Sequence, residues 1–576
     1  MAQHEQTGEQ TGLEGEQGEQ GEPGLSGHGG DLALEVARRH GVTTLFTLSG
    51  AHVFPIYDAA HRGGAVRILD VRHEQTAVFA AEATAKLTRG TGLAVLTAGP
   101  GVTNGISAVT SAWFNGSPLV VLGGRAPDAR WGTGSLQELD HPPLLAPVTK
   151  LSATVHRTSD IPARVHEAFL TAGTAHRGPV FLDIALEALF GRANAEAPTS
   201  TPPPAPEPDP AALDAVLAEL AAATHPVLVL GSDVWTGRAE GPARDLAETL
   251  GIPVVSNGMG RGVLPRGHEL AVTRARAEAL GQADLVIVVG APLDFRLGYG
   301  AFGGSRTDSA RPHTARVVHV VDSPDQLARH VRLAAGLAGD LAVVMEHLAA
   351  AWQHHPQSRP DPWRDWRVRL LDAARAAGER DRELLTSAAE PIHPARIYGD
   401  LLAQLDDDAV LIGDGGDFVS FAGKYVEPAR PGCWLDPGPY GCLGGGLGAA
   451  IAARLARPAA QVVLLLGDGA AGLSLMDVDT LVRHRLPVVI VVGNNSAWGL
   501  EKHPMRALYG YDVAADLGPQ TRYDEVVRAL GGAGETVHAP QELAGALRRA
   551  FAAEAPYLVN VLTDSEVAYP RSTTGI

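Results

Sequence analysis

The chain has 576 residues, of which 45% are hydrophobic, and this length allows three or four domains with ample core. Its formal net charge of −18 argues against a surface that neutralises nucleic-acid phosphates, and its two cysteines, Cys433 and Cys442, argue against a disulfide framework or a Cys/His metal site. Because the longest apolar runs are strand-length, well below the roughly 20 residues that span a bilayer, and no secretory signal opens the chain, we expect a cytoplasmic protein with no membrane segment.

Residues 1–29 contain Glu, Gln and Gly but almost no apolar side chain. Such a composition cannot bury enough surface to fold, so we predict a disordered acidic tail over this range. Order is expected to begin near Asp31, which precedes the helical pattern of residues 32–41 and suits a helix cap.

Strand-length apolar segments alternate with helix-length segments between residues 30 and 195. The strands are predicted in TTLFTL (43–48), AVRILDV (65–71), LAVLTA (93–98) and PLVVLGG (118–124). This alternation is typical of a doubly wound α/β domain with a parallel sheet.

Two more α/β units follow along the chain. A Pro-rich segment, 196–210, is predicted to be a linker to a central unit over 211–350. The charged, Trp-containing stretch 351–391 is predicted to be a helical linker to a third unit over 392–576. The fold class expected is therefore α/β, with three doubly wound parallel-sheet domains.

The most informative spacing lies in the third unit. An apolar strand ends in Gly467-Asp468-Gly469, and a second apolar strand delivers Asn495, 27 positions after Asp468. Ligands bind at the carboxyl ends of strands in an open parallel sheet, so Asp468 and Asn495 should lie side by side there. Both offer the hard oxygen atoms that Mg²⁺ shares with substrate phosphates, and the flanking glycines permit close approach of a phosphate to the following helix.

This segment, GDG followed by about two dozen residues and NN, resembles the thiamine-diphosphate (ThDP) motif. The resemblance implies that Mg²⁺ is held by Asp468, the Asn495 side chain and the carbonyl of Ala497, and that it clamps the diphosphate. The three α/β units also resemble the layout of ThDP carboligases and decarboxylases, in the order pyrimidine-binding (30–195), central (211–350) and diphosphate-binding (392–576).

In that family, a glutamate hydrogen-bonds N1′ of the aminopyrimidine and drives the 4′-amine into the imino form that abstracts the C2 proton. Glu74, in the RHEQ text directly after the strand ILDV, matches this glutamate. Glu82, eight positions on, is the rival carboxylate. A structural acid at a helix N-terminus is the alternative interpretation of Glu74.

Further cofactor contacts are implied by resemblance. The GPG loop is expected near a cofactor, the loop after the strand AVLIGD is expected to present backbone amides to the diphosphate, and a bulky apolar residue is expected to bend the cofactor. The residues are Gly99, Pro100, Gly101, Asn104, Gly415, Gly416, Asp417, Phe418, Leu443, Gly467, Gly469 and Ala470.

The loop Ser49-Gly50-Ala51-His52 resembles the acetolactate-synthase loop that faces the C2 carbon, so Gly50 and Ala51 are predicted cofactor contacts and His52 is predicted to handle protons. Gln137, in SLQELD, matches that group's FQE stretch and is the third candidate catalytic residue. Lys150 matches its TK position, although a solvated lysine is the plainer interpretation.

Two other segments of the sequence differ from those of the FAD-binding synthases. The residues after the metal asparagine, Trp498 to Lys502, lack their Gln-Trp run, and the central unit lacks their Gly-Met-His-Gly stretch and resembles oxalyl-CoA decarboxylases and 2-hydroxyacyl-CoA lyases instead. FAD or ADP in the central domain is therefore possible but not supported by the sequence. Over residues 46–500, the chain is similar to acetolactate-synthase-like proteins with 2-hydroxyacyl-CoA lyase activity.

The resemblance implies a ThDP- and Mg²⁺-dependent enzyme that makes or breaks C–C bonds in a 2-oxo acid or a 2-hydroxyacyl-CoA, through a C2 carbanion and an enamine. It also implies a homodimer or homotetramer with sites at the subunit interface. The alternatives are an oxalyl-CoA-type decarboxylase and a non-catalytic binding protein of the same fold. A nicotinamide dehydrogenase is disfavoured because no G-x-G-x-x-G follows an early strand. The sequence does not identify the donor or the acceptor.

Overall fold

The computed structural model describes residues 24–204, 206–304, 314–356 and 361–569. Most of the predicted acidic tail, 1–29, lies outside these residues. Its last part was predicted wrongly, because Leu25–His28 form strand β1, which pairs antiparallel with β8 (Arg192–Ala195). This two-stranded sheet ties the start of the first domain to its end.

The first helix, α1 (Gly29–Arg39), begins three residues earlier than expected. His28 is its N-cap and accepts a hydrogen bond from the Asp31 backbone, while the Asp31 carboxylate accepts one from the His28 backbone. Asp31 therefore closes a capping box from inside the helix rather than capping it.

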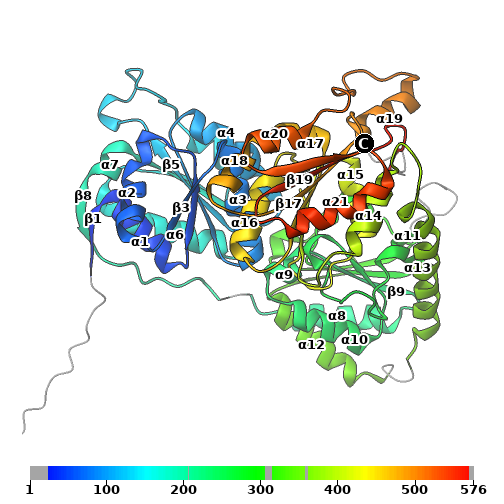
Figure 1. The fold of residues 1–576 in the computed structure, drawn as a ribbon. Coiled ribbons are helices and arrows are strands. Elements are labelled where there is room, and N and C mark those ends of the chain that lie inside the picture. Colours follow the sequence, from blue (N-terminus) through cyan, green and yellow to red (C-terminus); the bar gives the residue numbers. More distant parts are fainter. Residues whose placement is uncertain (1–23, 205, 305–313, 357–360, 570–576) are drawn as a thin grey trace, which may run out of the picture.

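Three parallel sheets with helices on both faces make up the fold, as the sequence predicts (Figure 1). The first sheet has the strand order β3-β2-β4-β5-β7-β6. Its strands are β2 (Thr44–Thr47), β3 (Arg67–Asp70), β4 (Gly92–Leu96), β5 (Leu119–Arg125), β6 (Leu151–Val155) and β7 (Pro179–Ala185). Its main helices are α1, α2 (Phe54–Gly63), α3 (Glu74–Thr88), α4 (Pro100–Phe114) and α6 (Ile161–Gly173).

The central sheet has the strand order β10-β9-β11-β12-β13. Its strands are β9 (Pro226–Leu230), β10 (Val254–Ser256), β11 (Leu285–Val289), β12 (Arg316–Val321) and β13 (Ala335–Ala338). The helices around it include α8 (Pro210–Ala221), α9 (Ser232–Thr236), α10 (Glu240–Leu250), α11 (Arg276–Gln282), α12 (Leu341–Gln353) and α13 (Arg364–Leu385).

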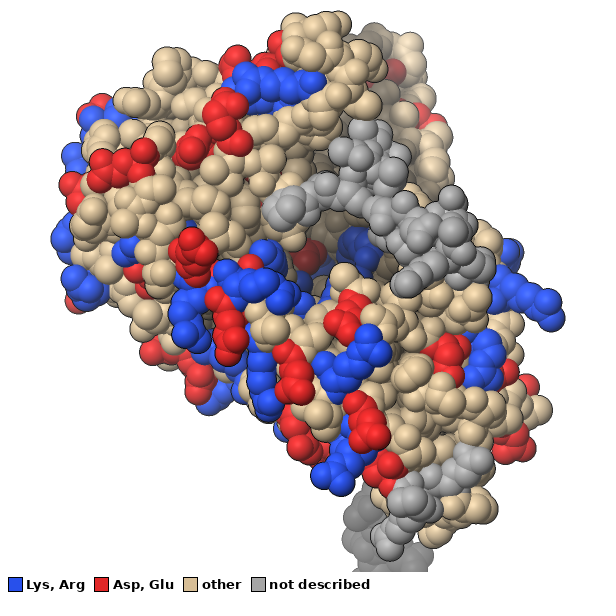
Figure 2. All heavy atoms as spheres, turned by 90° about the vertical axis from the view of Figure 1, so that its right-hand side faces the viewer, with Lys and Arg blue, Asp and Glu red and all other residues tan. Residues whose placement is uncertain are grey.

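The stretch predicted as a helical linker, 351–391, is largely part of the central domain. Trp352 and Trp363 stack with ring centroids 5.2 Å apart inside one core cluster, and Trp366 is buried in another. Figure 2 shows the side of the molecule on which α13 lies, where acidic and basic side chains are interspersed. The charge that suggested a linker is thus the solvated face of a packed helix.

The third sheet has the strand order β15-β14-β16-β17-β19-β18. Its strands are β14 (Val410–Asp414), β15 (Trp434–Leu435), β16 (Val462–Gly467), β17 (Val489–Asn494), β18 (Ala533–Val537) and β19 (Tyr557–Leu562). Its helices are α14 (Pro394–Leu402), α15 (Asp417–Tyr425), α16 (Gly446–Ala456), α17 (Asp468–Ser474), α18 (Val478–Arg483), α19 (Gly499–Tyr509), α20 (Tyr523–Ala529) and α21 (Pro540–Ala552).

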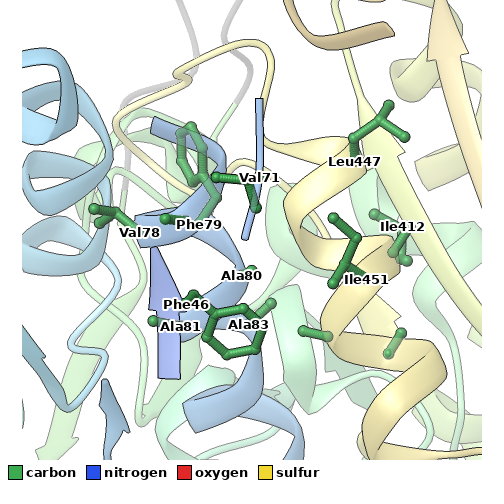
Figure 3. Close-up of a cluster of buried hydrophobic side chains, with 14 of the residues drawn as sticks. Phe46, Val71, Val78, Phe79, Ala80, Ala81, Ala83, Ile412, Leu447 and Ile451 are labelled. Atoms are coloured by element: carbon green, nitrogen blue, oxygen red, sulfur yellow. The ribbon is translucent and has the colours of Figure 1, made fainter. Parts of the chain in front are cut away.

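Helices α3 and α16 join the first and third domains through a shared core, in which Phe79 and Ile451 belong to one buried cluster (Figure 3). The helices approach closely, because a Cβ on Gly448 would lie 2.9 Å from the Thr76 carbonyl oxygen. Beside this contact, buried Asp477 accepts hydrogen bonds from the Thr76 hydroxyl at 2.6 Å and the Arg72 backbone at 2.7 Å. Within the described part of the chain, no helix is long and apolar enough to cross a membrane.

Candidate active site

Asp468 and Asn495 follow neighbouring strands of the third sheet, β16 and β17, at their carboxyl ends. The Asp468 side chain is buried; its Oδ1 accepts a hydrogen bond from the Gly469 backbone at 3.0 Å, and its Oδ2 has no hydrogen-bond partner. A buried carboxylate oxygen is costly to leave unpaired, so this atom requires a ligand or a proton.

The two asparagines at the carboxyl end of β17 have different roles. Asn494 is structural, since its side chain donates to the Asn560 side chain and the Thr521 carbonyl, each at 3.1 Å. Asn495 is buried, and its Oδ1 accepts from the backbone of Ala497 at 3.1 Å. Its amide group points at the Asp417 carboxylate, 3.5 Å away.

The electrostatics of this edge fit a divalent cation. Burial, together with the nearby Asp417 carboxylate, raises the pKa of Asp468 to about 7, against hydrogen bonds from backbone groups that lower it. A cation would stabilise both carboxylates at once, and carboxylate, amide and carbonyl oxygens form the donor set that Mg²⁺ prefers. The predicted ligands Asp468, Asn495 and Ala497 can therefore hold Mg²⁺.

The predicted phosphate loop follows β14. Gly415 adopts φ +121°, a conformation that L side chains rarely adopt, and a Cβ there would lie 3.1 Å from the Gly467 backbone nitrogen. Asp417 and Phe418 begin α15, with Gly416 as its N-cap. The Phe418 ring is buried against Gly493, so only its backbone can face a phosphate.

Asp414, the last residue of β14, holds the next loop in place. Its buried carboxylate accepts hydrogen bonds from the backbones of Gly444 at 3.1 Å and Gly446 at 2.8 Å, and burial raises its pKa to about 6. Leu443 precedes this anchored turn and is half-buried. Ala470 is buried and faces Gly415 across the sheet edge.

Sequence reasoning missed one aromatic contact at this edge. A Cβ on Gly469 would lie 2.5 Å from the Trp498 ring, so this ring covers the start of α17. The requirement for glycine at this position therefore comes from Trp498 as well as from any phosphate. The position of Trp498, three residues after the metal asparagine, was the available signal.

In the first domain, Glu74 is the first residue of α3 and its side chain is buried. Asn104 donates from Nδ2 to Glu74 Oε2 at 3.0 Å. The rival carboxylate, Glu82, is engaged elsewhere through Oε1, which binds Lys86 at 2.7 Å, the Asn115 amide at 2.8 Å and the Ser117 hydroxyl at 3.2 Å. Glu82 is therefore a structural residue, and Glu74 remains the candidate.

The GPG loop starts α4 beside Glu74. Gly99 adopts φ +58° and ψ −115°, and a Cβ there would lie 2.8 Å from Cβ of Gln137. Gly101 lies near Glu74, since a Cβ on Gly101 would be 3.9 Å from Glu74 Oε1. The structure thus brings Gln137, the loop Gly99-Pro100-Gly101, Asn104 and Glu74 together.

The loop after β2 lies at the same sheet edge. Gly50 packs against Thr97, and His52 Nδ1 lies 3.1 Å from the Thr97 hydroxyl. His52 is buried whereas Ala51 is exposed. Burial lowers the pKa of His52, more than a hydrogen bond with the Leu136 carbonyl raises it, so the imidazole is neutral near pH 7.

A second feature that sequence reasoning missed is a buried polar network behind Gly99. The His141 ring accepts a hydrogen bond from the Gly99 backbone and contacts Asp183, which Arg125 also binds. These residues belong to no motif that the sequence displays, and only the fold brings them together.

A cavity of about 760 Å³ lies where the central domain meets the first domain. Its lining includes Lys150, His176, Arg177, Asp233 and Arg296. Lys150 is not a solvated lysine: its ammonium donates to the Thr174 carbonyl at 2.6 Å, and burial lowers its pKa to about 8.

Potential metal ligands of His176, Asp233 and Asp322 lie within 4.8 Å of one another at this cavity. His176 and Arg177 already bind Asp322, at 2.9 and 3.5 Å. Two carboxylates facing a histidine and an arginine are close to charge balance, so this cluster is an interdomain ion-pair network. Two other central-domain arginines are structural, because Arg274 binds Asp381 and Arg276 binds the Arg296 carbonyl.

Comparison with known proteins covers all three domains. Family profiles match residues 27–144 as thiamine pyrophosphate enzyme, N-terminal TPP binding domain, 213–348 as its central domain, and 414–561 as its C-terminal TPP binding domain. Acetolactate synthase large subunit IlvG of Mycobacterium tuberculosis is 49% identical over 548 residues, covering 94% of this chain and 97% of that protein.

Proteins named 2-hydroxyacyl-CoA lyase 2 are also similar. The Caenorhabditis elegans protein is 36% identical over 585 residues, covering 93% of this chain and 89% of its own. The human protein is 33% identical over 549 residues, covering 88% and 84%.

Proposed function

Because the chain belongs to the thiamine pyrophosphate enzyme family and is a ThDP-dependent enzyme that forms or cleaves C–C bonds, we propose that Asp468, Asn495 and Ala497 hold its diphosphate through Mg²⁺. The observation that carries this proposal is the buried, unpartnered Oδ2 of Asp468 beside a second carboxylate. Bound ThDP supplies the carbanion chemistry; the side chains supply binding, orientation and proton transfer.

Glu74 is the proposed partner of the aminopyrimidine. Asn104 fixes its Oε2, while Oε1 makes no hydrogen bond with any described residue and remains available for a ring nitrogen. His52 is proposed to exchange protons with the substrate, since it is buried and neutral near pH 7, as a general base must be. Gln137 is proposed to orient the substrate beside the GPG loop.

We propose a 2-oxo acid as the donor substrate, on the 49% identity to a protein named acetolactate synthase. A second candidate is a 2-hydroxyacyl-CoA. It is supported by the relatives named 2-hydroxyacyl-CoA lyase 2 and by the ammonium group of Lys150 at the central cavity, which suits a phosphorylated ligand.

The test is a substrate panel on the full chain reconstituted with ThDP and Mg²⁺. Acetolactate formed from pyruvate supports the first candidate. Aldehyde and formyl-CoA formed from a 2-hydroxyacyl-CoA, with pyruvate inert, support the second and overturn the first. No turnover of either substrate, with ThDP bound, contradicts both.

We also propose a homodimer or homotetramer in which the first domain of one subunit and the third domain of another complete each site. Apolar side chains are exposed at both sheet edges: Leu136 is 78% exposed, and Leu473 and Met476, at and just after the end of α17, are 54% and 55% exposed. A partner subunit would bury them. Light scattering after size exclusion tests this, and a monomer at micromolar concentration contradicts it.

The free thiols of Cys433 and Cys442 support our proposal of a cytoplasmic location.

A further inference from the structure

His141 is fully buried between a catalytic loop and a carboxylate. Its Nε2 accepts a hydrogen bond from the Gly99 backbone at 2.9 Å, and its Nδ1 lies 3.0 Å from Asp183 Oδ2. A backbone N–H can only donate, so Nε2 must be the unprotonated nitrogen. Nδ1 therefore carries the proton and donates a hydrogen bond to Asp183, which fixes the neutral tautomer.

Asp183 is itself held on an inner strand of the sheet. It lies in β7, is fully buried, and receives the Arg125 guanidinium at 3.2 Å from the adjacent strand β5. The Phe181 ring, also on β7, meets the His141 ring nearly edge-on, with centroids 6.2 Å apart. Because two strands and an aromatic contact fix this arrangement, the imidazole has little freedom to turn.

His141 is connected by contacts through helix α4 to Glu74, the glutamate proposed to bind the cofactor. Gly99 is the N-cap residue of α4 and has dihedral angles that only glycine adopts readily. Asn104, one turn into α4, donates to Glu74 Oε2. The position of Gly99 therefore sets the position of the amide group that orients Glu74.

We propose that His141 is a positioning residue for Glu74, acting through Gly99 and Asn104, with Asp183 holding its tautomer. This inference rests on the role of Glu74 in the proposed function. Its consequence is that the hydrogen-bond acceptor at His141, rather than the bulk of the ring, controls the rate of C2-proton loss from bound ThDP.

The experiment compares His141→Phe, which keeps a ring but removes the acceptor, with His141→Gln, whose amide oxygen can take the place of Nε2. The rate of deuterium exchange at C2 of bound ThDP is measured for both in the full chain with Mg²⁺. We expect exchange to fall by about tenfold in H141F, the effect of losing one hydrogen bond, and to recover to within about threefold in H141Q.

Phe169→Leu is the control for stability alone. Phe169 is buried in the same domain, but in a different hydrophobic core cluster from Phe181, the residue that contacts His141. It should lower the melting temperature and leave the exchange rate unchanged. Wild-type exchange in H141F, or equal losses in H141F and H141Q, overturns the positioning role. Unchanged exchange in Glu74→Gln instead overturns the role of Glu74 in the proposed function, so the two failures are distinguishable.

Discussion

Asn104 donates a hydrogen bond to Glu74 across two strand–helix units, with Nδ2 and Oε2 3.0 Å apart. Glu74 begins the helix after β3, and Asn104 lies in the helix after β4, and these strands flank β2 in the sheet. The bond therefore spans the edge above β2, where the His52 loop also lies. The arrangement fixes one carboxylate oxygen and leaves the other for a ligand.

Glu74→Gln should preserve ThDP binding and reduce C2-proton exchange by at least a hundredfold. The amide keeps the shape of the side chain but removes the carboxylate that favours the imino tautomer, and general acid–base contributions are typically 10²–10⁴-fold. Hydrogen–deuterium exchange of bound ThDP, followed by proton NMR after acid quenching, measures the effect.

Glu82→Gln is the matched control, because Glu82 is a buried carboxylate of the same helix that binds Lys86 and Asn115. It should destabilise the protein by about 1–3 kcal/mol, since it leaves buried partners unsatisfied, and should not change exchange. Equal losses of exchange in the two variants would show that a stable α3, rather than the Glu74 carboxylate, is what matters.

Asp468→Ala should abolish Mg²⁺-dependent ThDP binding, since it removes the buried carboxylate whose Oδ2 has no protein partner. Isothermal titration with ThDP, at fixed Mg²⁺, measures the change. The control is Asp479→Ala on α18, whose carboxylate binds Arg483 at 2.8 Å at the domain interface. Binding that survives in D468A would remove Asp468 from the metal site.

The residues at the two sheet edges could be predicted because local sequence carries their geometry. Glu74 and Asp468 each follow an apolar strand directly, and Gly99 and Gly415 mark turns that need positive φ. A strand, a tight turn and a helix start are encoded within a few residues, so a sequence motif of this kind also indicates where its residues lie in the fold.

The His141 network could not be predicted for the opposite reason. Arg125, His141 and Asp183 come from β5, a loop and β7, and none stands in a spacing that indicates contact. Similarly, the exposed charges of α13 led to the prediction of a linker, although Trp363, Trp366 and Leu370 are buried and pack this segment against the central domain. Which face of a helix is buried depends on its partner, and the partner is distant in sequence.

Gly493→Ala should destabilise the third domain by about 1–3 kcal/mol. A Cβ at this position in β17 would lie 2.4 Å from the Phe418 ring, which is buried and cannot move without displacing its own neighbours. Chemical denaturation measures the loss. Gly241→Ala in α10 is the matched control, because a Cβ there meets nothing within 4 Å and an alanine favours the helix. A midpoint in G493A at or above that of the wild type would refute the tight contact.

His176→Gln should reduce thermal stability more at pH 6 than at pH 8.5. Burial lowers the pKa of His176, but the hydrogen bond to Asp322 and the charges of Asp233 and Asp322 outweigh this and raise it overall, against the nearby Arg177. A raised pKa means that protonated His176 stabilises the folded state fully below about pH 6.5, its unfolded value, and that this contribution is lost as the pH rises through the folded value. Scanning calorimetry of wild type and H176Q across this pH range tests the sign. Burial raises the pKa of Asp233 to about 6 while the charge of His176 lowers it, so the gap between wild type and H176Q reports the loss of this pair of charges rather than of His176 alone. A gap that stays constant from pH 6 to 8.5 would mean that His176 joins the two domains by packing rather than by charge.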